Sequence, residues 1–320
     1  MTSPAPPRDP RLTEQRNPAT AAIDLASPSE IVDMMHREDR TVADAVYHER
    51  ERIAAAIEIV EECFRSGGHL YYVGAGTSGR LAVLDAAECP PTFSSSPDLV
   101  QGIMAGGYAA LVKSAEGAED DFDAGGAAID AKEAGPNDVI FGIAASGSTP
   151  FVKGAIAKGV ARHCKTMLMA CTTPPQDLLI NCDVAIVVKT GPEALTGSTR
   201  LKAGTATKMV LNMVTTGAFI RWGKAYGNLM VDLRALSDKL HDRSERIIME
   251  VCEVSRDEAR KAIASADGSV KTAIVMLKRK VDREFAEQLL EEAHGYARAV
   301  VGEPPPPSRL SGEFSTDPRD

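Results

Sequence analysis

The sequence predicts a doubly wound α/β domain, in which a parallel sheet lies between two layers of helices. Five short apolar runs between residues 70 and 188 alternate with stretches whose apolar residues have helical spacing. Such runs are typical of parallel strands, because crossover helices cover both faces of the sheet. The composition is that of a globular protein, since 44% of the 320 residues are hydrophobic and 25% are charged. It excludes collagen, mucin and a wholly disordered chain.

The chain before the sheet is expected to be a helical lead-in. Residues 1–11 are rich in proline and polar residues and are expected to be disordered, and residues 12–53 form the lead-in. Ser27-Pro28-Ser29-Glu30 and Thr41 are typical helix starts, because hydroxyl side chains cap the first amide groups.

The sheet domain is expected to span residues 54–224. Its strand runs are LYYVG (70–74), LVQGIMAG (99–106), DVIFGIAA (138–145), KTMLMAC (165–171) and VAIVV (184–188). The rest of the chain is predicted to form a long helix (225–254), a small three-helix module (255–301) and a disordered tail (302–320).

Charge and cysteine content limit the partners and the compartment. The 36 basic and 45 acidic side chains give a net charge of −9 without a basic stripe, so a nucleic-acid partner is not expected. The absence of a long apolar segment argues against a membrane, and the six cysteines without a C-x-x-C pair predict buried thiols in the cytoplasm. The six histidines lack metal-ligand spacing, so neither a metal nor another cofactor is expected.

A glycine-rich loop follows the first strand run. It consists of Gly76, Thr77, Ser78, Gly79 and Arg80. Backbone N–H groups of such a turn can approach an anion, and the dipole of the following helix favours negative charge there. The loop fits the dinucleotide pattern, but Asp98 stands at the wrong end of the second strand for a ribose, and no Walker Gly-Lys-Ser/Thr follows. A phosphate or phosphosugar is the better expectation.

Two further loops carry small hydroxyl or basic residues. Ser146, Gly147, Ser148 and Thr149 follow the third strand run, and Ser198, Thr199, Arg200 and Lys202 stand at the start of a long helical stretch. Because the carboxyl ends of parallel strands share one edge of the sheet, the first two loops are expected to meet at a phosphate. For the last segment, a capped helix start with two solvated bases is an open alternative.

Two groups of carboxylates are candidates for acid and base chemistry. Glu88 stands just before Pro90 and Pro91, which are expected to end the helix there and to fix where the carboxylate points. Glu119 belongs to the acidic run 116–121, which could equally be a solvated acidic face.

Six segments occur in order at close spacing: GAGTSGRLAVLDAAECPPTF, VQGIMAGG, AEGAEDD, GIAASGSTPFV, LTGSTRLKAGTATKMVLNM and YGNLMVDL. Together they resemble the N-acetylmuramic acid 6-phosphate etherases, members of the sugar-isomerase (SIS) domain superfamily. The resemblance runs from about Leu12 to Val301 and includes LTEQRNPAT near the start. It implies that residues 54–224 are a SIS domain and that residues 255–301 are a UBA-like module.

The resemblance implies a cofactor-free lyase. This enzyme would cleave the D-lactyl ether of N-acetylmuramic acid 6-phosphate with water, giving N-acetylglucosamine 6-phosphate and D-lactate, by elimination and then hydration. By position, Glu88 is the proton donor and Glu119 is the second catalytic carboxylate. The three loops would bind the sugar phosphate, in a homodimer whose sites lie near the subunit interface.

Three departures from the family pattern affect the predicted binding loops. Ser148 and Phe151 stand where the family has Arg and Tyr, and Ser cannot replace the planar, multidentate guanidinium of Arg. Ser237 stands in place of an Asn, and Cys171-Thr172-Thr173-Pro174 in place of a CNP-type strand end. Substrate affinity and identity are therefore the least determined properties.

Two alternatives stay open from the sequence. One is a non-catalytic sugar-phosphate-binding regulator related to the glucokinase regulatory protein, which has two SIS domains in a longer chain. The other is a phosphosugar isomerase, which would interconvert aldose and ketose phosphates and release no lactate.

Overall fold

The computed structural model of the chain describes residues 11–113, 115–233 and 238–306. It consists of two compact units, Met1–Trp222 and Gly223–Asp320. Residues 1–10 and 307–320 of the two predicted tails, and the departure at Ser237, lie outside the described residues.

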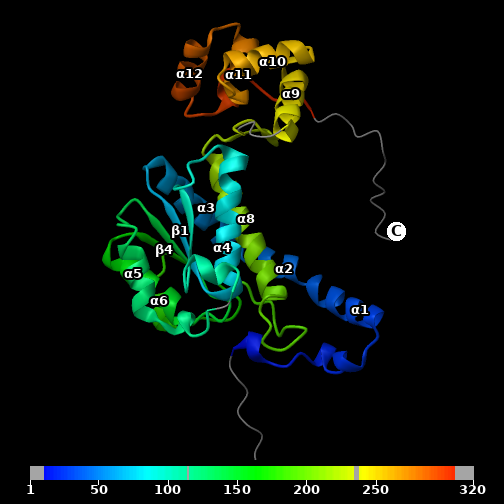
Figure 1. Cartoon of the computed structure of the whole chain (residues 1–320), viewed down its shortest axis with the longest axis vertical. Coiled ribbons are helices and arrows are strands. Elements are labelled where there is room, and N and C mark those ends of the chain that lie inside the picture. The colour runs from blue at the N-terminus through cyan, green and yellow to red at the C-terminus, as the bar shows by residue number, and fades with distance from the viewer. Residues whose placement is uncertain (1–10, 114, 234–237, 307–320) are drawn as a thin grey trace, which may run out of the picture. The chain divides into compact units, whose positions relative to one another are not determined.

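The first unit is built on a five-stranded parallel sheet, which confirms the predicted fold class (Figure 1). The strands are β1 (Leu70–Gly74), β2 (Val100–Met104), β3 (Val139–Ile143), β4 (Lys165–Ala170) and β5 (Val184–Val187), in the order β2-β1-β3-β4-β5. Each strand lies within one of the predicted apolar runs. β1 and β3 are buried along their whole length, because helices cover both faces of the sheet.

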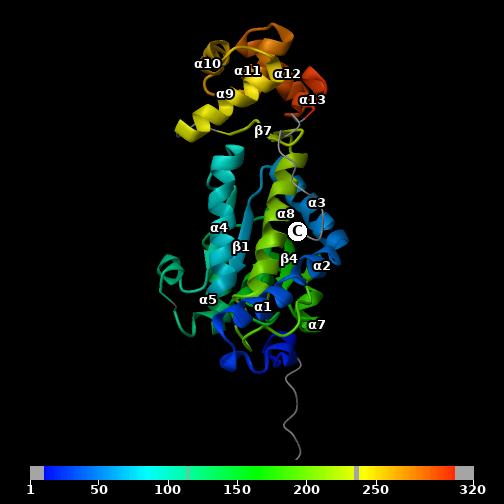
Figure 2. The same cartoon turned by 90° about the vertical axis from the view of Figure 1, so that its right-hand side faces the viewer.

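Two layers of helices enclose the sheet (Figures 1 and 2). One layer consists of α3 (Arg50–Arg65), α4 (Gly76–Phe93) and α8 (Lys202–Arg221). The other layer consists of α5 (Phe122–Asp130) and α6 (Pro150–Ala161). Successive residues of a strand point to opposite faces, so Tyr72 packs in the core with the first layer and Tyr71 in the core with the second.

The sheet has a topological switch point between β1 and β3. These strands are neighbours, but α4 leaves β1 on one face of the sheet and α6 leaves β3 on the other. Ligands of open α/β sheets bind in the crevice that such a switch point leaves at the carboxyl ends of the strands. The first two predicted binding loops follow these two strands.

The chain before the sheet is helical. Three short 3₁₀ turns between Leu12 and Leu25 lead to α1 (Pro28–Asp39) and α2 (Val42–Tyr47). α1 begins with a capping box, in which the Glu30 amide donates to the Ser27 hydroxyl and the Ser27 amide donates to the Glu30 carboxylate. After the sheet's fourth strand comes one further short helix, α7 (Gln176–Leu179).

The second unit contains a hairpin and short helices. β6 (Ala225–Tyr226) pairs antiparallel with β7 (Leu229–Met230). The helices are α9 (Asp238–Cys252), α10 (Arg256–Ser265), α11 (Val270–Arg279), α12 (Arg283–Glu292) and α13 (Ala297–Val301). The sequence predicts one helix through 225–254, but the hairpin occupies its first part. Gly227 has a φ of +59°, which suits the first central position of a tight hairpin turn.

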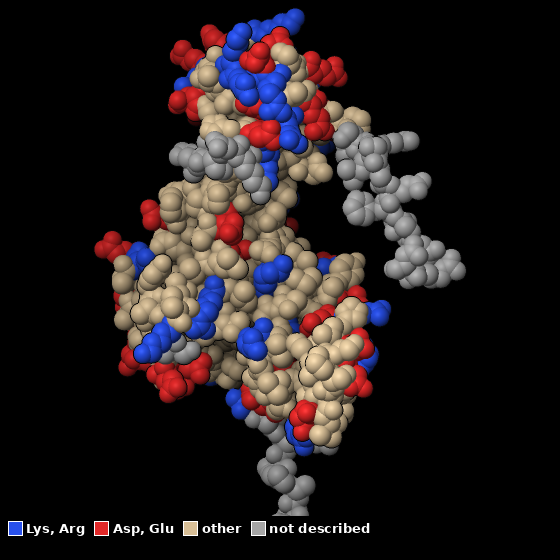
Figure 3. Space-filling model, turned by 45° about the vertical axis from the view of Figure 1, so that its right-hand side comes forward, with Lys and Arg blue, Asp and Glu red and all other residues tan. Residues whose placement is uncertain are grey.

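Ion pairs connect the helices of the second unit. Arg256 lies 2.8 Å from Asp242 and 2.6 Å from Glu245, and Arg260 lies 2.6 Å from Glu245. Figure 3 shows basic and acidic side chains next to one another on this unit. The two arginines and Asp242 are partly or fully exposed, whereas Glu245 is buried and pairs with both arginines.

Candidate functional site

The glycine loop leads directly from β1 into α4. Gly76 has a φ of +52°, and the N-cap residue of α4, Ala75, provides no capping side chain. The loop is tight, because a Cβ atom at Gly79 would come within 2.8 Å of the Gly74 carbonyl oxygen. The first amide groups of α4 therefore stay available at the carboxyl edge of the sheet, where the helix dipole favours an anion. This is an arrangement that binds phosphate groups.

The second predicted loop follows β3, beside the first. Gly147 has a φ of +68°, and a Cβ atom there would lie 3.1 Å from Pro174. The Ser148 amide donates to the Ser146 hydroxyl at 3.4 Å, so the two serines support each other's position. Thr149 is the N-cap residue of α6, and its hydroxyl makes no capping bond. The structure therefore brings two helix starts without a side-chain cap to the switch point.

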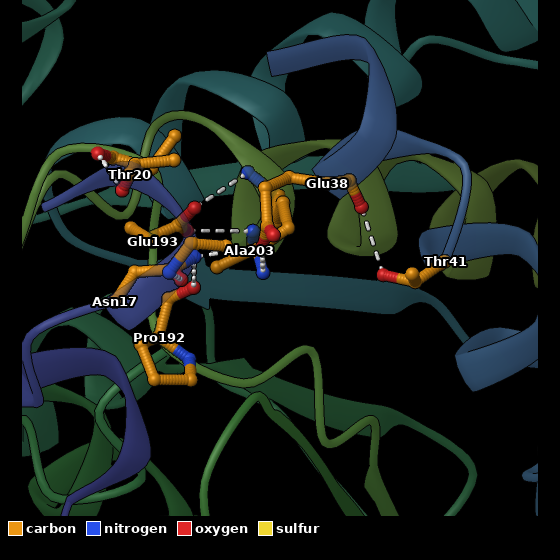
Figure 4. A network of polar contacts seen from close by, with 10 residues as sticks. Asn17, Thr20, Glu38, Thr41, Pro192, Glu193 and Ala203 are labelled. Atoms are coloured by element: carbon orange, nitrogen blue, oxygen red, sulfur yellow. Dashed lines mark hydrogen bonds and ion pairs between the residues drawn. The ribbon is translucent and has the colours of Figure 1, made fainter. Parts of the chain in front are cut away.

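The start of α8 differs from the other two, because a carboxylate of the chain caps it. Glu193 is fully buried, and its oxygens accept hydrogen bonds from the amides of Lys202 and Ala203, both at 2.9 Å (Figure 4). Burial raises the pKa of Glu193, although these hydrogen bonds favour the charged form. An anionic ligand therefore finds free helix amides at α4 and α6 rather than at α8.

Lys202, predicted as a ligand-binding base, lies in a buried ion pair. Its Nζ is 2.5 Å from Oε2 of Glu38 on α1, and only 3% of the residue is exposed. Burial acts to raise the pKa of Glu38, but the hydrogen bonds from Lys202 and Asn17 together hold it below its ordinary value. The other residues of the segment are more accessible, with Ser198 and Thr199 partly buried and Arg200 exposed.

Residues before α1 hold the segment that leads into α8, and the sequence pattern did not indicate this role. The Asn17 side-chain amide donates to the Pro192 carbonyl at 3.2 Å. The Thr20 hydroxyl donates to the Ala194 carbonyl at 2.8 Å. Figure 4 shows Asn17, Thr20 and Pro192 close to Glu193. Both Asn17 and Thr20 are buried. In the sequence, the one sign that these residues matter was the segment LTEQRNPAT (12–20), which is part of the family resemblance but did not indicate a structural role.

A small cavity brings part of the predicted site together. It has a volume of about 230 Å³, and its lining includes Gly76, Arg80, Glu116 and Glu119. Glu119 lies on a single 3₁₀ turn (Ala118–Asp120) and is exposed. The cavity thus places the acidic run beside the start of the glycine loop, so Glu119 stands next to the proposed anion position rather than on a distant face.

The guanidinium of Arg80 contacts the backbone of a neighbouring segment. Its Nε donates to the Leu111 carbonyl at 2.9 Å, and its Nη2 donates to the Ala110 carbonyl at 2.8 Å. Both carbonyls belong to the last residues of a 3₁₀ turn (Tyr108–Leu111) that follows β2. Arg80 therefore connects α4 to the chain that leads to the acidic run.

Glu88 lies apart from this cavity. It follows Gly76 by twelve residues on α4 and is exposed. At 1.5 Å per residue it stands about 18 Å farther along the helix. The two predicted catalytic carboxylates of one chain are therefore not brought together at the cavity.

The prolines after Glu88 do not end α4 where the sequence predicts. The helix continues through Pro90 and Pro91 to Phe93. Each proline lacks the amide donor and so removes one hydrogen bond to the residue four positions before it, but the backbone keeps its helical conformation up to Phe93. The Thr92 hydroxyl donates to the Glu88 carbonyl at 2.8 Å and so satisfies one acceptor in this last turn.

Asp85 is a second functional candidate that sequence reasoning missed. It is 6% exposed and accepts hydrogen bonds from Asn212 at 2.7 Å, Thr215 at 3.0 Å and Tyr72 at 3.1 Å. Burial raises the pKa of Asp85 despite these bonds. Because Asn212 and Thr215 belong to α8, Asp85 fixes α4 against α8 one turn before Glu88.

An apolar groove runs along α8. It has a volume of about 650 Å³ and is lined by residues of α2, α3 and α8 that include Met213, Ile220 and Asn212. Met213 and Ile220 are 42% and 47% exposed, and Leu84 on α4 is 52% exposed. The groove therefore presents apolar side chains to solvent on this side of α8. Since Asn212 also bonds Asp85, this surface adjoins the helix that carries Glu88.

Within residues 11–113, 115–233 and 238–306, no three His, Cys, Asp or Glu side chains come together in a way that could hold a metal ion. Nor is any helix in these ranges long and apolar enough to cross a membrane.

Known proteins resemble this chain in sequence and in fold. The family model of the glucokinase regulatory protein N-terminal SIS domain matches residues 52–160. The N-acetylmuramic acid 6-phosphate etherase of Rippkaea orientalis is 47% identical over 290 residues, which cover 91% of this chain and 94% of the relative. The etherase of Mycolicibacterium smegmatis is 47% identical over 292 residues, covering 91% of this chain and 97% of the relative.

A solved structure of phosphoheptose isomerase from Neisseria gonorrhoeae matches with a TM-score of 0.44 and 18% identity. The match covers 59% of this chain and 97% of that chain.

Proposed function

The chain belongs to the N-acetylmuramic acid 6-phosphate etherase family, and on this premise we propose how its residues bind and cleave the substrate. The enzyme is a lyase that cleaves the D-lactyl ether of N-acetylmuramic acid 6-phosphate with water, giving N-acetylglucosamine 6-phosphate and D-lactate. The observation that carries this conclusion is 46–49% identity to etherases over about 91% of the chain. Release of D-lactate from that substrate by the purified protein tests it.

The phosphate is proposed to bind at the switch point of the sheet. The starts of α4 and α6 offer amide groups there without a side-chain cap, whereas Glu193 occupies the start of α8. Hydroxyls of Ser146, Ser148 and Thr149 supply further donors without bulk. Because the protein as a whole carries a net charge of −9, such local donors have to hold the anion.

Glu119 and Glu88 are proposed to divide the proton transfers. In the open-chain sugar, the aldehyde acidifies the C2 proton, and Glu119 at the cavity takes it. The C3–O bond then breaks, and the departing lactate oxygen takes a proton from Glu88. Water adds to C3 of the unsaturated aldehyde, loses a proton to the Glu88 carboxylate, and C2 regains a proton from Glu119. Each carboxyl group thus returns to its starting state.

The two carboxylates of one site are proposed to come from two copies of the chain. Within one copy Glu119 lines the cavity, whereas Glu88 stands about 18 Å along α4 from Gly76. A two-fold dimer uses the same surface on both subunits. The apolar groove along α8, with the exposed Leu84 on α4, is such a surface close to Glu88. These features support a homodimer with sites near the subunit interface.

Replacing Ser148 by arginine is expected to tighten substrate binding. The guanidinium would add a bidentate, charge-assisted contact to the phosphate, and we expect the KM to fall roughly tenfold or more. Steady-state kinetics of lactate release measure the KM. Ser148→Lys is the control, because it adds a positive charge without the planar guanidinium that can form two parallel hydrogen bonds. An unchanged or higher KM for Ser148→Arg would mean that this loop is built around a different ligand.

The regulator alternative is favoured by one observation, the match of residues 52–160 to the SIS domain of the glucokinase regulatory protein. A regulator would bind the sugar phosphate without turnover. Its binding would also be unaffected by loss of the Glu88 carboxylate. The etherase relatives cover far more of the chain, and we therefore retain the lyase.

A cytoplasmic location is proposed from the thiols. Cys63, Cys89, Cys164 and Cys171 are buried and unpaired. Burial raises the pKa of Cys63 to about 12, which keeps the thiol protonated and unreactive. Buried free thiols are typical of a reducing compartment.

A further inference from the structure

Arg80 lines the cavity and also donates hydrogen bonds to the backbone of the segment that leads to the acidic run. The two carbonyls that it contacts, those of Ala110 and Leu111, end the 3₁₀ turn Tyr108–Leu111. Carbonyls at a helical C-terminus have no partner within the turn. A guanidinium at this place satisfies both with two donors on one rigid edge, and its charge suits the negative end of the turn.

Two described parts of the segment between β2 and α5 are held in different ways. The 3₁₀ turn Ala118–Asp120 packs against α6 through Ala118, whereas the 3₁₀ turn Tyr108–Leu111 accepts the two hydrogen bonds from Arg80. Ala110 is 2% exposed and is the buried residue of the 3₁₀ turn. Its neighbours face solvent, with Tyr108 and Val112 85% and 91% exposed. The two hydrogen bonds from Arg80 on α4 therefore locate the Ala110–Leu111 end of this turn.

The same segment brings Glu116 and Glu119 to the cavity beside the glycine loop. We propose that Arg80 is a positioning residue, which places Glu119 for proton abstraction at C2 by holding the segment that precedes it. This inference rests on the proposed catalytic role of Glu119. It differs from the expectation that Arg80 binds the substrate phosphate, because Nε and Nη2 are already engaged by backbone carbonyls.

Steady-state kinetics of the full chain separate the two roles. Arg80→Gln is expected to lower kcat for lactate release by roughly 10 to 100-fold with little change in KM, since a misplacement of about 1 Å costs that much in rate. Arg80→Lys should recover part of the loss, because an ammonium can still donate to one carbonyl. Lys132→Gln is the matched control. It also removes a cation that donates a hydrogen bond, to the side-chain oxygen of Gln101, but Lys132 lies outside the cavity lining, so kcat and KM are expected to stay unchanged.

A second readout does not depend on turnover. Trypsin should cleave after Lys113 faster in Arg80→Gln than in the wild type, and Arg80→Lys should lie between them. An increase in KM with an unchanged kcat would overturn the proposal and make Arg80 a substrate ligand. Unchanged rates of both turnover and trypsin cleavage would also overturn it, because Arg80 would then have neither role. If Glu119→Gln keeps full activity, the catalytic role of Glu119 fails instead, whereas the proteolysis still reports whether Arg80 holds the segment.

Discussion

Glu88→Gln is expected to lower the rate of D-lactate release by roughly 10²–10⁴-fold, the usual contribution of a general acid. Glutamine keeps the size of the side chain but cannot protonate the departing lactate oxygen. The fold should survive, because the Glu88 side chain is exposed and its backbone carbonyl, which accepts from Thr92, is retained. The C2 proton is removed before lactate departs, so Glu88→Gln should still catalyse removal of the C2 proton.

The measurement combines two assays on the same protein. Lactate release is followed by a coupled assay, and exchange of the C2 proton is followed by NMR in deuterated water. Glu88→Gln should show exchange without release, and Glu58→Gln, an exposed glutamate on α3, should behave as the wild type. Near-normal lactate release by Glu88→Gln would remove Glu88 from the mechanism.

Glu119→Gln is expected to have an effect of similar size, roughly 10²–10⁴-fold, but on the earlier step. Without a base at the cavity the C2 proton stays in place, so both exchange and lactate release should be lost. The difference between the two variants assigns the roles. If Glu119→Gln retained exchange, the base would have to be another group, and Glu116, which lines the same cavity, would be the first to replace.

Mixing the two inactive variants extends this test to the dimer. If each site takes Glu119 from one copy and Glu88 from the other, a mixed dimer has one intact site. Random exchange of equal amounts should then restore about one quarter of the wild-type activity, because half of the two-fold dimers are mixed. No recovery, although subunit exchange is shown directly, would mean that both carboxylates of a site belong to one chain.

The sheet could be predicted from the sequence because its signal is local. Strands buried on both faces have to be apolar throughout, and all five predicted runs contain a strand. The two loops at the switch point were also predictable, since Gly76 and Gly147 both adopt positive φ where a strand turns into a helix. These features depend on neighbours in the sequence.

The remainder of the site depends on contacts between distant residues. Asn17 and Pro192 are 175 positions apart, and no spacing rule links them. The burial of Lys202 follows from its pairing with Glu38, 164 positions away, so its sequence context suggested a solvated or ligand-binding base. The separation of the two carboxylates also depends on distant contacts, because the acidic run returns to the start of α4 while Glu88 lies twelve residues farther along that helix.

The most direct test of the lyase assignment is to incubate the purified protein with N-acetylmuramic acid 6-phosphate in water enriched in ¹⁸O. Elimination and hydration break the bond between C3 and oxygen, so D-lactate should appear without label in its hydroxyl group. The N-acetylglucosamine 6-phosphate should carry ¹⁸O at C3, after label at C1 has exchanged out in ordinary water. Label in the lactate hydroxyl, or no lactate from a folded protein that binds the sugar phosphate, would contradict the assignment.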